Sequence, residues 1–361
     1  MNHVYFLTPG PSQLYYTVPQ HIKTALKEHI CSISHRSKSF QQIVAHALEH
    51  LRALFQLPTD YYIAFTASAT EVWERAIENL SQEYTLHLVN GNFSKKFYEF
   101  SKQLKRNAQK WEVSPGKGFY LSEMPPFDPP ELLCLTHNET STGVTMPLED
   151  IYTLRKRYPE ALIIVDAVSS VPYPEIDFSQ IDSLFFSVQK GFGLPAGLGV
   201  WIFNQRCLAK AEELLSKGKS IGTYHSLPSL LASIQKNETP ETPNVLGIYL
   251  LGKVAEDMNR RGIKTIRQEI EAKAAIAYHH LQKNNDKFSL FVNDPSHRSA
   301  TVIVAEVLHR PAADFIEFCK QKGIVLGSGY GNFKGVHIRI ANFPTHAKET
   351  FQHLADLMAQ W

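Results

Sequence analysis

Residues 161–170 read Ala-Leu-Ile-Ile-Val-Asp-Ala-Val-Ser-Ser, a continuous apolar run that ends in a carboxylate and small polar residues. A strand that is apolar along its whole length is buried on both faces, as in a parallel sheet covered by helices. Segments with helical periodicity alternate with further short apolar runs, which lie at residues 61–65, 85–89, 132–136, 183–188 and 199–203. This alternation predicts βαβ units and a mainly parallel α/β sheet with helices on both faces.

A change of pattern near residue 245 predicts a second structural unit. The segment Ile234–Asn244 is polar and contains two prolines, so we expect an extended loop there. One long helix is predicted next, roughly over Val245–Asn284, and a smaller α/β unit follows it. We therefore expect a domain boundary near residue 257.

The composition excludes several classes of protein. Of the 361 residues, 43% are apolar and 20% are charged, which excludes disordered, collagen-like and coiled-coil chains. The net charge of +2 offers no general field for nucleic acid, and no window of about 18 apolar residues is present to span a membrane. The first ten residues lack a secretory signal pattern, and the cysteines lie far apart at positions 31, 134, 207 and 319. We expect a cytoplasmic protein with small-molecule partners, and neither nucleic acid nor membrane.

Ligands of parallel sheets bind at the carboxyl ends of the strands, so polar residues at these ends are the first candidates for a site. After the run at 61–65, Ser68 and Glu71 form a capping box before a predicted helix. Small residues at this helix start leave its N–H groups open to an anion, which the helix dipole also favours. An ordinary helix cap without a ligand is the alternative interpretation.

Asp166 and Lys190 stand at two further strand ends. A carboxylate at the end of a buried strand is costly unless a cation or N–H groups stabilise it, and the N–H groups of Ser169 and Ser170 would suffice. Lys190 lies between an apolar run and a glycine-rich loop, where burial would lower its pKa and make the amine a nucleophile. A surface lysine is the alternative. An anion cradle, a carboxylate and a lysine at neighbouring strand ends match the phosphate, the ring nitrogen and the aldehyde of pyridoxal 5'-phosphate.

Six short motifs, taken in order, resemble those of class V aminotransferases, which are fold-type I enzymes that depend on pyridoxal phosphate. They cover nearly the whole chain and lie at residues 7–11, 34–37, 138–140, 165–170, 188–190 and 239–243. Within this family the chain is most similar to the phosphoserine aminotransferases. The resemblance implies a large domain at 16–257 with a mainly parallel sheet of the seven-stranded type. It also implies a small α/β domain made of residues 1–15 and 258–361.

The resemblance further implies roles for residues around the cofactor. Lys190 would bind the cofactor covalently and carry a proton, and Asp166 would keep the ring nitrogen protonated. The other implied contacts are Thr140 at the ring hydroxyl, Phe93 stacked on the ring, and Ala69, Thr70 and Gln189 at the phosphate. Thr242 would reach the same phosphate from a second subunit, which implies a homodimer with active sites at the subunit interface. Phe93 also has helical spacing with two other phenylalanines, so a plain core position is the alternative.

Three residues match the positions at which the family binds its substrates. Arg339 matches the arginine that holds the substrate carboxylate, and His35 and Arg36 match a pair that lines the substrate-anion pocket. Surface ion pairs are the alternative for these residues. The second His-Arg pair of the phosphoserine enzymes is missing at 328–334, where Lys334 is the candidate replacement.

The expected reaction is transamination between glutamate and 3-phosphohydroxypyruvate, which yields 2-oxoglutarate and O-phosphoserine in serine biosynthesis. The missing His-Arg pair, together with Glu241 where asparagine is usual, leaves a second activity open. This is another class V transamination, such as the alanine–glyoxylate or serine type, on small unphosphorylated substrates. A protein that binds the cofactor without turnover is the third interpretation.

Two motif matches are discounted. Residues 46–50 match the H-x-x-E-H pattern of zinc proteases, but these side chains fall beside or opposite the apolar face of their predicted helix, consistent with solvent exposure. Residues 191–196 match a dinucleotide-binding pattern, but Pro195 and a following strand leave no helix for it to open. We expect no metal site and no nucleophilic cysteine of the desulfurase type.

Overall fold

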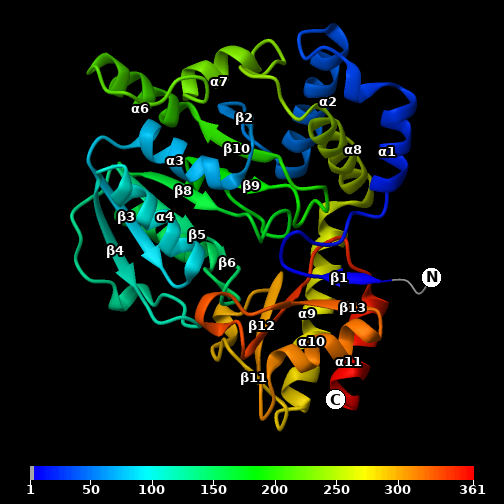
Figure 1. Ribbon diagram of the computed structural model, residues 1–361. Coiled ribbons are helices and arrows are strands. Elements are labelled where there is room, and N and C mark those ends of the chain that lie inside the picture. The colour runs from blue at the N-terminus through cyan, green and yellow to red at the C-terminus, as the bar shows by residue number, and fades with distance from the viewer. Residues whose placement is uncertain (1–3) are drawn as a thin grey trace.

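The computed structural model describes residues 4–361 and contains two main β-sheets (Figure 1). The larger sheet has seven strands in the order β2-β10-β9-β8-β5-β3-β4. Their bounds are Tyr61–Thr66 (β2), Tyr84–Val89 (β3), Asn107–Glu112 (β4), Leu132–Thr136 (β5), Leu162–Asp166 (β8), Ser183–Ser187 (β9) and Gly199–Asn204 (β10). All neighbouring strands are parallel except β10, which is antiparallel to β2 and β9. The predicted mainly parallel sheet of seven strands is confirmed.

Alternate residues of the central strands enter two separate cores, one on each face of this sheet. In β8, Ile163 and Val165 belong to one core, and Leu162 and Ile164 belong to the other. Helices of the first core include α2 (Lys38–Phe55), α5 (Leu148–Arg157) and α8 (Val245–Arg261). Helices of the second core are α3 (Ala69–Leu80), α4 (Asn92–Gln103), α6 (Gln205–Ser216) and α7 (Leu227–Ile234). Burial on both faces explains why these strands are apolar along their whole length.

A second sheet of five strands brings the two ends of the chain together. Its order is β1-β13-β14-β12-β11, with bounds Tyr5–Leu7, Ile324–Ser328, His337–Ala341, Val302–Val307 and Phe288–Leu290. Strand β1 is parallel to β13, and the other neighbours are antiparallel. The apolar core of this unit includes helices α9 (Ile263–Lys283), α10 (Ala312–Gln321) and α11 (Lys348–Gln360). Figure 1 shows α9 running from α8 to this sheet.

The single long helix predicted over Val245–Asn284 is wrong, because Gly262 separates α8 from α9. Gly262 has a φ of +86°, a left-handed conformation that a continuous α-helix cannot contain. Helix α8 runs through residue 257, and the domain boundary at that position stays a prediction.

The remaining elements are short or lie at the edge of the large unit. Helix α1 covers Val18–Lys27, and β6 and β7 form a two-stranded pair at Asn138–Glu139 and Val144–Thr145. Single 3₁₀ turns lie at Ile30–Ser32, Leu121–Glu123, Phe178–Gln180, Pro295–His297 and Gly331–Phe333. No helix within residues 4–361 combines the length and the apolar character that a membrane span needs.

Candidate active site

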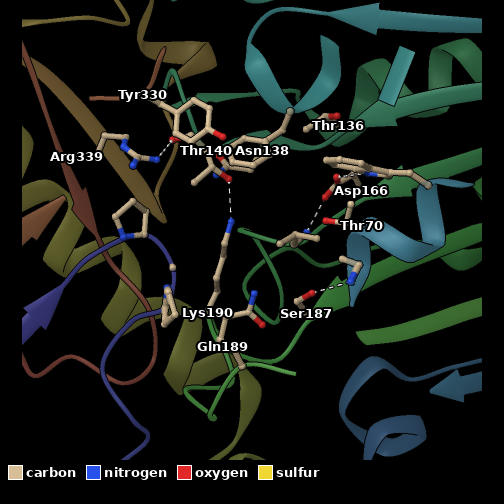
Figure 2. Close-up of a pocket in the computed structure, with 18 residues that line it drawn as sticks. Thr70, Thr136, Asn138, Thr140, Asp166, Ser187, Gln189, Lys190, Tyr330 and Arg339 are labelled. Carbon is tan, nitrogen blue, oxygen red and sulfur yellow. Dashed lines mark hydrogen bonds between the residues drawn. The ribbon is translucent and has the colours of Figure 1, made fainter. Parts of the chain in front are cut away.

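A cavity of about 300 Å³ lies at the carboxyl ends of the parallel strands and is lined by residues of both sheets (Figure 2). Thr136, Asp166 and Ser187 end strands β5, β8 and β9 and line the cavity from the large sheet. Arg339 of β14 lines it from the small sheet, and Lys190 enters it from the loop after β9. This is the place at which a parallel sheet binds its ligands.

Lys190 is buried, with 6% of its surface exposed, so the alternative of a surface lysine is wrong. Its Nζ donates a hydrogen bond to Oγ1 of Thr140 at 3.1 Å. Burial lowers the pKa of Lys190 to about 8; the charge of Asp166 opposes this shift and the charge of Arg339 adds to it. A useful share of the amine is therefore neutral near pH 7, as a nucleophile requires.

The motif at residues 7–11 brings its backbone against this lysine. Gly10 has a φ of +131°, and a Cβ placed on it would lie 2.8 Å from Cε of Lys190. Glycine is the residue that tolerates both this conformation and this close approach. The motif therefore shapes the wall of the cavity beside the reactive amine.

Asp166 is buried and accepts two hydrogen bonds. One comes from the indole Nε1 of Trp73 at 3.0 Å, and the other comes from the N–H of Val168 at 3.0 Å. From the sequence, the N–H groups of Ser169 and Ser170 were expected to donate to Asp166. This expectation is wrong. Trp73 lies in α3, 93 residues before Asp166, and no sequence signal connected the two.

Burial raises the pKa of Asp166 to about 6, while its two hydrogen bonds and the charge of Lys190 act in the opposite direction. The carboxylate is thus held in a setting that favours a partner bearing an N–H or a positive charge. A ligand that spans the cavity from Lys190 to Asp166 would meet both an amine and an acid with shifted pKa values.

The start of α3 is capped as predicted, with one difference. Oγ of Ser68 accepts the N–H of Glu71 at 3.2 Å, but the Glu71 carboxylate accepts the N–H of Ala67 and not that of Ser68. The N–H of Ala69 donates to Oγ of Ser187 at 2.8 Å, so a residue absent from the sequence analysis ties this helix to β9. The predicted phosphate contacts that line the cavity are Ala69, Thr70 and Gln189.

Phe93 lines the cavity from the start of α4, and its ring centroid is 5.4 Å from Nζ of Lys190. The fully buried carboxylate of Glu139 accepts the N–H groups of Phe93 at 3.1 Å and of Ser94 at 2.9 Å. A carboxylate at this position satisfies the free donors of the helix start. Glu139 therefore fixes Phe93 and, through the adjoining backbone, Thr140. Phe93 also packs against the second core, as the alternative of a core position predicted, and its stacking on the ring stays a prediction.

Arg339 keeps donors available inside the cavity. Its Nε donates to the carbonyl of Ser328 at 2.7 Å, and its Nη1 donates to the carbonyl of Thr140 at 3.3 Å. Nη2 has no hydrogen-bond partner within residues 4–361. Burial lowers the pKa of Arg339 to about 10, which leaves the guanidinium charged at neutral pH and able to bind a carboxylate.

Comparison with known proteins identifies the family. Residues 4–340 match the family model described as Aminotransferase class-V. The chain belongs to the class V aminotransferase family. A solved phosphoserine aminotransferase from Cytophaga hutchinsonii is 49% identical and superposes with a TM-score of 0.97, covering 100% of this chain and 99% of its own. A phosphoserine aminotransferase from Rhodococcus opacus is 27% identical over 96% of this chain and 91% of its own length.

A structure of phosphoserine aminotransferase from Trichomonas vaginalis with bound pyridoxal phosphate shares the fold of this aminotransferase, with 20% identity, a TM-score of 0.82, and coverage of 99% and 100% of the two chains. The residues of the present cavity fit that cofactor. A buried amine with a lowered pKa suits an aldehyde, and the buried Asp166 carboxylate suits a protonated ring nitrogen. Membership of the class V aminotransferase family also implies this cofactor.

Some predicted site residues of this aminotransferase do not line the cavity: His35, Arg36 and Thr242. The Arg36 guanidinium donates to the Glu238 carboxylate at 2.9 Å and to the Thr239 carbonyl at 2.8 Å. The motifs at 34–37 and 239–243 therefore form one cluster, in which Thr242 is exposed. Lys334, the candidate for a missing cation, is also exposed and does not line the cavity.

A buried histidine joins this cluster to the start of α3. His225 is 2% exposed and hydrogen-bonds with Glu71 through Nδ1 and with Glu241 through Nε2, the latter at 3.0 Å. Burial alone would lower the pKa of His225, but the hydrogen bonds and charges of the two carboxylates raise it to about 9. The charged His225 imidazole therefore links the loop that contains Thr242 to the helix that contains Thr70 by hydrogen bonds.

The discounted motif at 46–50 makes a contact that sequence analysis missed. Ligand atoms of His46, His50 and Glu256 of α8 lie within 4.8 Å of one another. His46 and His50 are partly buried where solvent exposure was expected, whereas Glu49 of the motif is exposed as expected. Glu256 already forms ion pairs with Lys253 at 3.2 Å and with Arg260. Positive charge is thus already present at this carboxylate, and we assign no metal to the cluster.

Replacing Gly10 with alanine should lower transaminase activity on the order of 100-fold, because the new Cβ displaces Lys190 and small displacements in an active site carry large kinetic costs. Steady-state kinetics on the cofactor-loaded enzyme measure the effect. Gly335→Ala is the matched control, since no atom lies within 4 Å of its Cβ position. Unchanged kinetics in Gly10→Ala would contradict the assigned contact.

The hydrogen-bonded ion pairs of His225 with Glu71 and Glu241 should make the thermal stability of the protein depend on pH. A pKa raised to about 9 means that its contribution is complete below the ordinary histidine pKa of about 6.5 and is lost as the pH rises through about 9. We expect the melting temperatures of the wild type and of His225→Gln to differ most at pH 6 and to converge by pH 10. A constant difference over this range would show that the imidazole is not charged in the folded protein.

Proposed function

We propose that the protein transfers the amino group of glutamate to 3-phosphohydroxypyruvate in ping-pong half-reactions, with pyridoxal 5'-phosphate as cofactor, and so serves serine biosynthesis. The observation that carries the proposal is the single cavity that contains a buried lysine, a buried carboxylate and a charged arginine. The 49% identity to a phosphoserine aminotransferase supports the choice of a phosphorylated substrate.

Residues of the cavity have separate roles in the proton transfers of this reaction. When bound, pyridoxal phosphate supplies a carbonyl carbon and an electron-accepting ring. Asp166 holds a proton at the ring nitrogen, and its donors Trp73 and Val168 keep the carboxylate in place. Lys190 removes a proton from the substrate carbon and returns it, because a pKa of about 8 gives access to both forms of the amine. Thr140 orients the Lys190 amine by its hydrogen bond.

Binding and orientation fall to residues around this centre. Arg339 binds the substrate carboxylate, and its bonds to two backbone carbonyls hold the guanidinium at the cavity. Phe93, which lines the cavity, would stack on the cofactor ring. Ala69 and Thr70 at the start of α3, together with Gln189 after β9, would hold the cofactor phosphate, and the helix dipole at that end of α3 favours an anion.

The active unit in this proposal is a homodimer. His35, Arg36 and Thr242 would complete an anion site, yet they lie outside the cavity of their own subunit. Arg36 is bound to the 238–240 segment, so the cluster is an ordered surface that can meet the cavity of a partner. One subunit then supplies Lys190 and Asp166, and the other supplies the second set of charges.

Spectroscopy of the cofactor-loaded protein tests the reaction. Addition of O-phosphoserine or glutamate should remove the absorption band of the lysine-bound cofactor near the edge of the visible range, because the amino group is transferred to the cofactor. Lys190→Ala should lack this band from the start. Loss of the band with alanine or serine alone would favour the class V activity on unphosphorylated substrates. No change with any amino donor would indicate a protein that binds the cofactor without turnover.

Hybrid dimers test the assignment of Arg36 to the partner's site. Arg36→Ala should weaken the binding of phosphorylated substrates by about 2 kcal/mol, the scale for losing one charged partner. Co-expression of Arg36→Ala with Lys190→Ala should restore activity, because one site of the hybrid then has both native residues. Co-expression of Lys190→Ala with Asp166→Ala is the control that should stay inactive, since both residues belong to one cavity. If co-expression of Arg36→Ala with Lys190→Ala does not restore activity, Arg36 does not act in the cavity of the partner subunit.

A further inference from the structure

A second cation, the exposed Lys96, contacts a residue that lines the cavity. Tyr330 lines the cavity beside Arg339 (Figure 2), and the Arg339 guanidinium carbon is 5.5 Å from the Tyr330 ring centroid. The Tyr330 hydroxyl accepts a hydrogen bond from Nζ of Lys96 at 3.0 Å, and the same Nζ is 5.4 Å from the ring centroid. Two positive charges therefore flank one aromatic ring at the entrance to the site.

Lys96 is connected to the cofactor region through Phe93. Both residues lie in the first turns of α4, three positions apart and thus on one face of the helix. The Phe93 ring centroid is 5.8 Å from Nζ of Lys96, 5.4 Å from Nζ of Lys190 and 5.1 Å from the Tyr330 ring centroid. Phe93 therefore contacts both the reactive amine of Lys190 and the ammonium of Lys96.

The charge of Lys96 is not neutralised by the protein. Within residues 4–361 its ammonium forms no ion pair with a carboxylate, whereas the neighbouring Lys95 pairs with Glu99 at 3.9 Å. A hydroxyl and two ring faces orient the ammonium without cancelling its charge. Two unneutralised cations, Lys96 and Arg339, therefore create a local field at the entrance that favours a molecule with two anionic groups.

We propose that Lys96 and the Tyr330 hydroxyl bind the phosphate of the substrate while Arg339 binds its carboxylate. This inference rests on the proposed function, in which the acceptor is a short acid that is anionic at both ends. Lys96 then takes the place of the second His-Arg pair that is missing at 328–334. Lys96 and Lys334 are both exposed, but Lys96 is the one whose ammonium contacts Tyr330 of the cavity wall. An ammonium offers three rotatable donors, which suits a phosphate, whereas the planar fork of Arg339 suits a carboxylate.

The test compares Lys96→Gln with the wild type and with Lys95→Gln, the adjacent exposed lysine, on the cofactor-loaded enzyme. The acceptors are 3-phosphohydroxypyruvate and hydroxypyruvate, which differ only in the phosphate. Lys96→Gln should lower kcat/KM for the phosphorylated acceptor by about tenfold or more, chiefly through KM, and leave hydroxypyruvate unaffected. Lys96→Arg should keep most of the preference, and Tyr330→Phe should lose part of it. Lys95→Gln should match the wild type with both acceptors.

The outcomes separate this inference from the proposed function. A wild type that prefers the phosphorylated acceptor and a Lys96→Gln variant with the same preference would overturn the role of Lys96 and leave the proposed function standing. A wild type that does not distinguish the two acceptors would overturn both. Equal losses for both acceptors, or the same loss in Lys95→Gln, would show that the substitution disturbs α4 and would also overturn the role of Lys96.

Discussion

The removal of Lys190 and Asp166 from water in one cavity is the constraint on which the rest of the site depends. Burial moves the two pKa values toward each other, to about 8 for the amine and to about 6 for the acid. Near neutral pH the amine can therefore both accept and donate a proton, and the acid seeks an N–H partner. Neither property exists in solvent, so the surrounding structure must keep water out and still support both groups.

The sheet and its two cores provide that support. Strands β8 and β9 are buried on both faces, so the residues that follow them start from fixed positions. Polar contacts then hold the reactive groups from outside the sheet, as Trp73 does for Asp166 and Glu139 does for the Phe93 helix start. Gly10 completes the wall by letting the N-terminal segment lie against the lysine. The chemistry therefore depends on segments that are far apart in the sequence.

This distance explains what the sequence could and could not predict. Apolar runs and helical periods are local patterns, and they predicted the parallel sheet and the positions of Asp166 and Lys190 at strand ends. The partners Trp73, Ser187 and Glu139 make contacts set by packing, which no local pattern reports. The break at Gly262 was missed because one glycine weakens a helical pattern only slightly, whereas its left-handed backbone ends the helix completely. The family motifs named Arg36 as a residue of the substrate pocket, but no local pattern reports that it binds the 238–240 segment and lies outside the cavity.

The proposed half-reactions place one further demand on the entrance of the site. Glutamate and 3-phosphohydroxypyruvate are each anionic at both ends, and each must present its reacting carbon to the same Lys190. Two cations of different geometry would meet this demand, because Arg339 can take the carboxylate next to the reacting carbon while Lys96 takes either a second carboxylate or a phosphate. An ammonium that is hydrogen-bonded to the Tyr330 hydroxyl can turn toward either anion with a small change in its side chain. Selectivity would then come from charge placement at the entrance, and the buried residues of the cavity would serve both substrates without change.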